Sequence, residues 1–139
     1  MLVNLQRKIK LDTTPLKVFV SSLGTQIDDV AGKDFSVAFI SDRRMKELNG
    51  FFRGKDSTTD VLSFPHEADE FDSDETKLGD IVISVEQAQK QAKENKLTLE
   101  NEIKQLILHG LLHLCGYDHE IDRGEMNKRE LELRRKLKI

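Results

Sequence analysis

The sequence lacks the features that mark secreted and membrane proteins. Cys115 is its single cysteine, so the chain has no internal disulfide and suits a reducing compartment such as the cytosol. No stretch approaches the roughly 18 consecutive apolar residues of a membrane-spanning helix. Residues 1–10 also lack the apolar core of a signal peptide. We therefore expect a cytoplasmic protein without a membrane segment.

A strong charge of one sign is also missing. Basic residues number 22 and acidic residues 25, so the net charge of −3 does not indicate a nucleic-acid-binding protein. The distribution is uneven, however: residues 66–75 hold six acidic residues and no basic one, whereas residues 42–55 hold five basic and two acidic residues. Residues 122–139 are also basic. These segments are either ordinary solvated surface or a surface that faces a polyanion.

A length of 139 residues with 37% hydrophobic residues suits one domain with one core. Alternating or β-branched apolar runs predict strands at residues 2–9, 35–40, 61–64 and 81–85. Apolar periodicity and N-cap residues, Ser84 and Thr98 among them, predict helices over residues 15–30, 42–50, 85–95, 99–115 and 122–139. We predict a single α+β or α/β domain over residues 1–139, with a small mixed sheet of three or four strands and about five helices.

Three of the four histidines lie in HGLLHLCGYDH, residues 109–119. His109 and His113 are four residues apart on a predicted helix, so both imidazoles lie on one face and can reach one Zn²⁺. A continuing helix would carry His119 away from that face. Gly116 can adopt a left-handed conformation that ends the helix and returns the chain. The spacing predicts one zinc ion per chain on three histidines, with other first-row metals as alternatives.

Three protein ligands leave a fourth position for water, which is typical of catalytic zinc. The histidine spacing is that of the metzincin proteases, in which the residue after the first histidine is the glutamate general base. Here that residue is Gly110, so an ordinary metzincin peptidase is not expected. Cys115 lies about 200° round the helix from His113, which favours a place in the core over a role as ligand.

A second group of polar residues lies in RGKDSTTDVLSFP, residues 53–65. By itself it is an ordinary charged turn before a strand. Alternatively, the planar guanidinium of Arg53 binds a phosphate through two hydrogen bonds, and Lys55 adds a second positive charge that contacts the substrate. In LGDIVIS, Asp80 stands at the start of an apolar strand. Its carboxylate needs a hydrogen-bond partner there, because burial of an unpaired charge is costly. We expect that partner to be a ligand histidine or a backbone cap.

Taken together, HGLLHLCGYDH, RGKDSTTDVLSFP and LGDIVIS resemble the YbeY family of bacterial endoribonucleases. Length and element order are similar to the family over nearly the whole chain. The resemblance implies a zincin-like α+β fold and metal-dependent cleavage of single-stranded RNA. It links that cleavage to maturation of the small-subunit (16S) ribosomal RNA 3′ end and to ribosome quality control. It also implies zinc ligands at His109, His113 and His119 and a functional arginine at Arg53.

We therefore expect a zinc-dependent endoribonuclease that acts on single-stranded and ribosomal RNA, with the small ribosomal subunit as a partner. Zinc would activate water or polarise a phosphoryl oxygen, and Arg53 would bind the phosphate. The general base is open between zinc-bound hydroxide, Asp118 and a substrate 2′-OH. One alternative is a ribosome-associated RNA- or protein-binding module with structural zinc. Another is a zinc hydrolase of a different substrate.

Overall fold

A mixed sheet with strand order β1-β2-β4-β3 forms the centre of the computed structural model, which describes residues 1–67, 76–118 and 121–139. Most of the acidic segment 66–75, and His119, lie outside these ranges. The strands are β1 (Leu2–Asn4), β2 (Asp34–Ile40), β3 (Val61–Pro65) and β4 (Lys77–Ser84). β2 pairs in parallel with β1 and β4, whereas β3 is antiparallel to β4.

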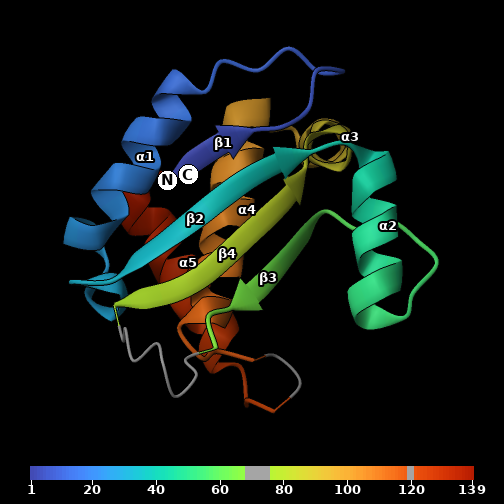
Figure 1. The fold of residues 1–139 in the computed structure, drawn as a ribbon. Helices are drawn as coiled ribbons and strands as arrows, with labels where there is room; N and C mark the ends of the chain where they lie inside the picture. The colour runs from blue at the N-terminus through green and yellow to red at the C-terminus, as the bar shows by residue number, and fades with distance from the viewer. Residues whose placement is uncertain (68–75, 119–120) are drawn as a thin grey trace.

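Helices cover the sheet, as Figure 1 shows, with α4 and α5 behind it and α2 beyond its β3 edge. They are α1 (Thr14–Gln26), α2 (Asp42–Arg53), α3 (Val85–Asn95), α4 (Leu99–Leu114) and α5 (Glu125–Leu137), with a short 3₁₀ turn η1 (Asp28–Val30) after α1. The predicted α+β class is confirmed. Within the described ranges, no helix combines the length and the apolar character needed to cross a bilayer.

The sheet buries apolar side chains on both of its faces, because successive side chains of a strand point to opposite faces and both sets include apolar residues. On one face, Val37 and Phe39 of β2 and Ile81 of β4 are fully buried in the main core with α1, α4 and α5. On the other face, Ile40 and Leu62 pack with Met45 of α2 in a smaller cluster. The sheet therefore fixes the position of α4 on one side and of α2 on the other.

The predicted N-caps at Ser84 and Thr98 are confirmed. The Ser84 hydroxyl accepts from the Gln87 N–H at 3.3 Å, and the Thr98 hydroxyl accepts from the Asn101 N–H at 3.1 Å. Other predicted boundaries are wrong, and β4 begins at Lys77 rather than at residue 81. The first strand is only Leu2–Asn4, α1 ends at Gln26, and α5 begins at Glu125, where the Asp122 carboxylate accepts from the second backbone N–H of the helix, that of Met126, at 3.0 Å.

The prediction that Gly50 ends the second helix is also wrong, because α2 continues to Arg53. Its end is set by Gly54, which has a φ of +66° and whose N–H donates to the Gly50 carbonyl at 3.1 Å. A left-handed glycine is a strong C-terminal stop, whereas a glycine inside a helix costs only about 1 kcal/mol. Phe51, Phe52 and Arg53 therefore lie on a helix rather than in a turn.

Gly110 allows α4 to approach the sheet closely. A Cβ at this position would lie 2.9 Å from Ile81 Cγ2 and 3.1 Å from Ser63 Oγ, too close for any larger side chain without a shift. The Ser63 hydroxyl donates to the Gly110 carbonyl at 3.1 Å, which ties β3 to the helix. The glutamate that metzincins carry after their first histidine has no room here, so packing explains its absence.

Candidate metal and phosphate site

His109 and His113 lie one turn apart near the C-terminal end of α4, and their imidazole nitrogens meet. The two Nε2 atoms are 3.2 Å apart, and the ring planes are 79° from each other. The predicted stacking of these two histidines on one helix face is therefore confirmed. The pair presents two nitrogen atoms to one point in space.

The Nδ1 atom of each ring is held by an acceptor. His109 Nδ1 donates to Glu130 Oε1 of α5 at 2.8 Å, and His113 Nδ1 donates to the Tyr117 carbonyl at 3.0 Å. Since a carboxylate and a carbonyl only accept, each neutral ring carries its proton on Nδ1. The lone pairs of both Nε2 atoms then point toward the same place.

This geometry fits a shared metal ion. Two nitrogen ligands about 2.0–2.1 Å from one Zn²⁺ lie roughly 3.3 Å apart at a tetrahedral angle, close to the observed 3.2 Å. The third predicted ligand, His119, lies outside the described residues. Within the described ranges, no group of three or more histidine, cysteine, aspartate or glutamate side chains gathers as a metal site. The structure thus places two of the three predicted ligands together.

Cys115 is half-buried and packs against the main core, as expected for a core residue. Burial raises the pKa of its thiol, and the nearby Asp29 carboxylate raises it further. A protonated thiol is a poor zinc ligand, because the thiolate is the form that binds metal. Its contacts with the main core thus agree with the expectation that Cys115 packs in the core and is not a ligand.

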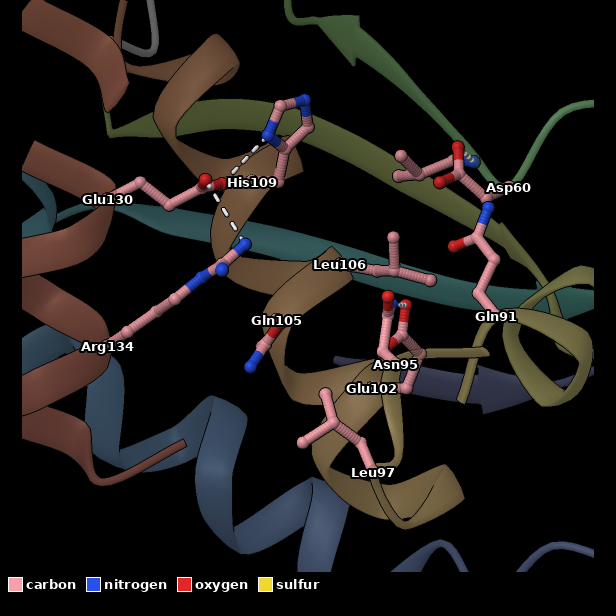
Figure 2. A pocket seen from close by; sticks show the side chains of 11 residues that line it. Asp60, Gln91, Asn95, Leu97, Glu102, Gln105, Leu106, His109, Glu130 and Arg134 are labelled. Carbon is pink, nitrogen blue, oxygen red and sulfur yellow. Dashed lines mark hydrogen bonds and ion pairs between the residues drawn. The ribbon is translucent and has the colours of Figure 1, made fainter. Parts of the chain in front are cut away.

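Glu130 and Arg134, one turn apart on α5, support His109 from behind. The Glu130 side chain is 8% exposed, and its second oxygen accepts from Arg134 Nη2 at 3.2 Å. Figure 2 shows the carboxylate reaching from α5 to His109, with the Arg134 guanidinium on its other side. Sequence reasoning missed this contact, because Glu130 is 21 residues from His109 and its only local signal is a Glu–Arg pair common on helix surfaces.

A cavity of ≈ 850 Å³ brings most of the predicted site residues together. Arg53 from the end of α2, the two α4 histidines, Gly116 and Asp118 all line it. The Arg53 side chain is exposed. The loop that follows it is tied down by Asn49, whose buried amide donates to the Ser57 carbonyl at 2.8 Å.

Two of the predicted site residues lie elsewhere. Lys55 is exposed in the loop after α2 and is not among the residues that line this cavity. Asp80 lies on β4 opposite Phe64 of β3, and its carboxylate accepts a hydrogen bond from the Ser36 hydroxyl on β2. The expectation that Asp80 would bind a ligand histidine or a backbone cap is wrong, because its side chain faces the neighbouring strand.

Gly116 has the positive φ that the sequence predicted, at +100°. α4 ends at Leu114, and the Gly116 N–H donates to the His113 carbonyl at 3.0 Å. A Cβ on Gly116 would meet no atom within 4 Å, so the need for glycine is conformational and not steric. The turn places the Tyr117 carbonyl next to His113.

A network around Asp29 of η1 anchors that turn. The Asp29 carboxylate accepts from the Tyr117 hydroxyl at 3.1 Å and from Arg129 Nη2 of α5 at 2.9 Å. Burial alone would raise the pKa of Asp29, but the hydrogen bonds from Arg129 and Tyr117 and the Arg129 charge lower it below 3.8. Burial, together with the hydrogen bond to Asp29, raises the pKa of Tyr117. The hydroxyl of Tyr117 thus holds the residue whose carbonyl orients His113.

A second cavity, of ≈ 610 Å³, shares His109 and Asp60 with the first. Figure 2 shows polar side chains around it from α3, α4 and α5. Its most buried carboxylate is Glu102, which is 3% exposed and accepts from Asn95 Nδ2 at 3.2 Å. His109 therefore stands where the two cavities meet.

Comparison with known proteins gives one consistent family. A family model described as Endoribonuclease YbeY matches residues 2–138. A protein named Endoribonuclease YbeY from Nautilia profundicola is 50% identical over 107 residues, which cover 77% of this chain and 74% of that one. Another, from Thermodesulfovibrio yellowstonii, is 39% identical over 144 aligned residues that cover 94% and 90% of the two chains. The solution structure of TM1509 from Thermotoga maritima has a TM-score of 0.63 at 30% identity and covers 95% of this chain and 85% of its own.

The Glu130 contact predicts a change in metal affinity. We expect Glu130→Gln to weaken zinc binding about 10- to 100-fold, because loss of a charged acceptor at Nδ1 weakens the nitrogen ligand on the same ring. Competition with a chelator of known affinity measures this. Glu132→Gln, on the same helix with a side chain that is 51% exposed, is the matched control and should bind zinc as the wild type does. Equal zinc affinity in Glu130→Gln and wild type would contradict the orienting role.

The lowered pKa of Asp29 predicts a pH-dependent loss of stability. Its ion pair contributes fully to the free energy of unfolding above its ordinary pKa of 3.8 and is lost as the pH falls through the lowered value. Urea unfolding of wild type and Asp29→Asn should therefore differ by a constant amount above about pH 5 and converge in acid. A difference that stays the same down to pH 2 would show that the charge of Asp29 does not stabilise the fold.

Proposed function

The chain belongs to the YbeY family of endoribonucleases, and from this we propose that it is a zinc-dependent hydrolase of single-stranded RNA. An endoribonuclease cleaves phosphodiester bonds within RNA, so RNA is the substrate. In this proposal, His109, His113 and His119 bind one zinc ion in a single hydrolase domain over residues 1–139. The observation that carries it is the pair of Nε2 atoms 3.2 Å apart, each on a ring whose Nδ1 is already bonded.

Zinc held there would supply Lewis-acid activation of water or of a phosphoryl oxygen. The chain's own residues do the rest. The Glu130 carboxylate and the Tyr117 carbonyl fix the tautomers of the two histidines, so the proton of each neutral ring is on Nδ1. Arg53, across the same cavity, binds the phosphate and offsets the negative charge that develops on its oxygens. Asp118, which lines the cavity, accepts the proton of the attacking group.

We further propose that the RNA is ribosomal, that cleavage contributes to 3′-end maturation of the small-subunit RNA and to ribosome quality control, and that the enzyme works in the cytoplasm with the small subunit as its partner. The resemblance of the three motifs supports the RNA and the partner, and the single cysteine supports the compartment. Lys55 is proposed as a further phosphate contact, outside the cavity.

A zinc ion with a purely structural role is less well supported. The His109 side chain is 29% exposed and lines two cavities. Structural zinc sites are closed, whereas catalytic sites keep a position open to water or substrate. The site therefore favours catalysis over a binding module that only needs zinc to fold.

Cleavage of an unstructured RNA oligonucleotide, measured together with zinc content, tests the proposed function. We expect the zinc-loaded protein to cleave, a chelator to abolish cleavage, and His113→Ala to lose both zinc and activity. Full activity of a zinc-free protein would contradict the proposal.

Substitution of Arg53 tests its role as a phosphate clamp. We expect Arg53→Lys to slow cleavage, because lysine keeps the charge but loses the bidentate fork. Arg53→Glu should slow it by about 10²- to 10³-fold, since a charged group at the scissile phosphate is lost and replaced by an anion. Zinc content and melting temperature should not change, because the side chain is exposed.

The matched control is Arg7→Glu, which makes the same charge change at an exposed arginine that is not on α2 and lines neither cavity. It should retain nearly all activity. A normal cleavage rate in Arg53→Glu would show that Arg53 is only a surface residue.

A further inference from the structure

Three phenylalanine rings form a row at the end of α2 that the proposed chemistry does not use. The ring centroids of Phe51 and Phe52 are 4.8 Å apart, and those of Phe52 and Phe64 are 5.1 Å apart, both pairs edge to face. Phe51 is 82% exposed and Phe52 57% exposed. Large exposed aromatic side chains are costly in water, and a group of them indicates a binding surface.

The row lies at the candidate site. Phe52 and Phe64 line the same ≈ 850 Å³ cavity as Arg53 and the two histidines, whereas Phe51 does not line it. Phe52 and Arg53 both lie on the last turn of α2 and both line this cavity, so one ligand in the cavity can contact the aromatic ring and the guanidinium. A ligand that contacts both must carry an anionic group next to a flat apolar one.

A nucleotide of single-stranded RNA has this combination. We propose that the Phe52 ring, which packs against Phe64, is a stacking platform for an unpaired base of the RNA. A phosphate of the same RNA strand contacts Arg53. This inference rests on the proposed function and deepens it. Stacking of bases on aromatic side chains is a general means of binding single strands, because every base has a π-face.

The charge around the platform fits the same occupant. α2 carries four exposed basic residues against two acidic ones, and the loop that follows it, residues 54–60, carries one exposed basic residue and two acidic ones. Basic side chains beside exposed aromatic rings suit a polyanion with exposed bases better than an apolar protein surface. Because the bases of a duplex are already stacked on their neighbours, the platform also provides a physical basis for discrimination against double-stranded RNA.

The first test compares two changes of the same kind on the same helix. Phe52→Leu keeps an apolar side chain but removes the π-face. We expect it to weaken binding of an unstructured oligoribonucleotide about 5- to 100-fold, with duplex binding, zinc content and melting temperature unchanged. Phe52→Trp should bind at least as well as wild type. Phe51→Leu, outside the cavity, should change affinity much less, and equal losses in the two leucine variants would overturn the assignment to Phe52.

The second test removes the base instead of the ring. Oligoribonucleotides that each carry one abasic site, at successive positions, are titrated into wild type and Phe52→Leu. We expect one position at which the abasic site weakens wild-type binding but causes no further loss in Phe52→Leu. Losses that add independently at every position would overturn the proposal.

The outcomes separate this inference from the proposed function. If the wild type binds and cleaves single-stranded RNA and Phe52→Leu does so equally well, the stacking platform is wrong and the proposed function stands. If the wild type does not bind single-stranded RNA, both fail. If Phe52→Leu instead dissolves a dimer seen in sedimentation without a change in RNA affinity, the rings pack against a second copy of the chain and the proposal is overturned.

Discussion

The hydrogen bonds at the two histidine Nδ1 atoms are the constraint on which the rest of the site depends. By accepting the Nδ1 protons, the Glu130 carboxylate and the Tyr117 carbonyl leave both Nε2 lone pairs facing one point, 3.2 Å apart. If either acceptor were lost, the ring could turn or carry its proton on the other nitrogen. The orientation of both histidine rings therefore depends on Glu130 and Tyr117, which are not themselves among the predicted metal ligands.

Those acceptors are held in place by the packing of α4 against its neighbours. Gly110 lets the helix approach β3 and β4, and the Asp29 network ties the turn after the helix to η1 and α5. α5 in turn brings Glu130 to His109. The main core and the site are thus coupled through a single helix, and its position relative to the sheet decides whether Arg53 and the histidines line one cavity.

The sequence predicted those parts of the site that are local. A spacing of four on a helix places His109 and His113 together whatever the tertiary structure, and the positive φ of Gly116 follows from the turn that the motif requires. The contact between Glu130 and His109 could not be predicted, because the two residues are 21 positions apart and the contact depends on how α5 packs against α4. Phe52 could not be predicted for another reason. A glycine at position 50 favours a helix end there, but the C-cap at Gly54 outweighs the modest cost of Gly50 inside the helix, so α2 continues to Phe52 and places its ring at the cavity.

X-ray absorption spectroscopy of the zinc-loaded full chain tests the central claim most directly, because it reports the ligand atoms around the metal. The histidine geometry predicts imidazole nitrogen ligands, with the multiple-scattering pattern of histidine, at about 2.0–2.1 Å and no sulfur. His113→Ala should lose that signal along with the metal. A shell with sulfur at about 2.3 Å, or one without imidazole scattering, would contradict a site built on His109 and His113.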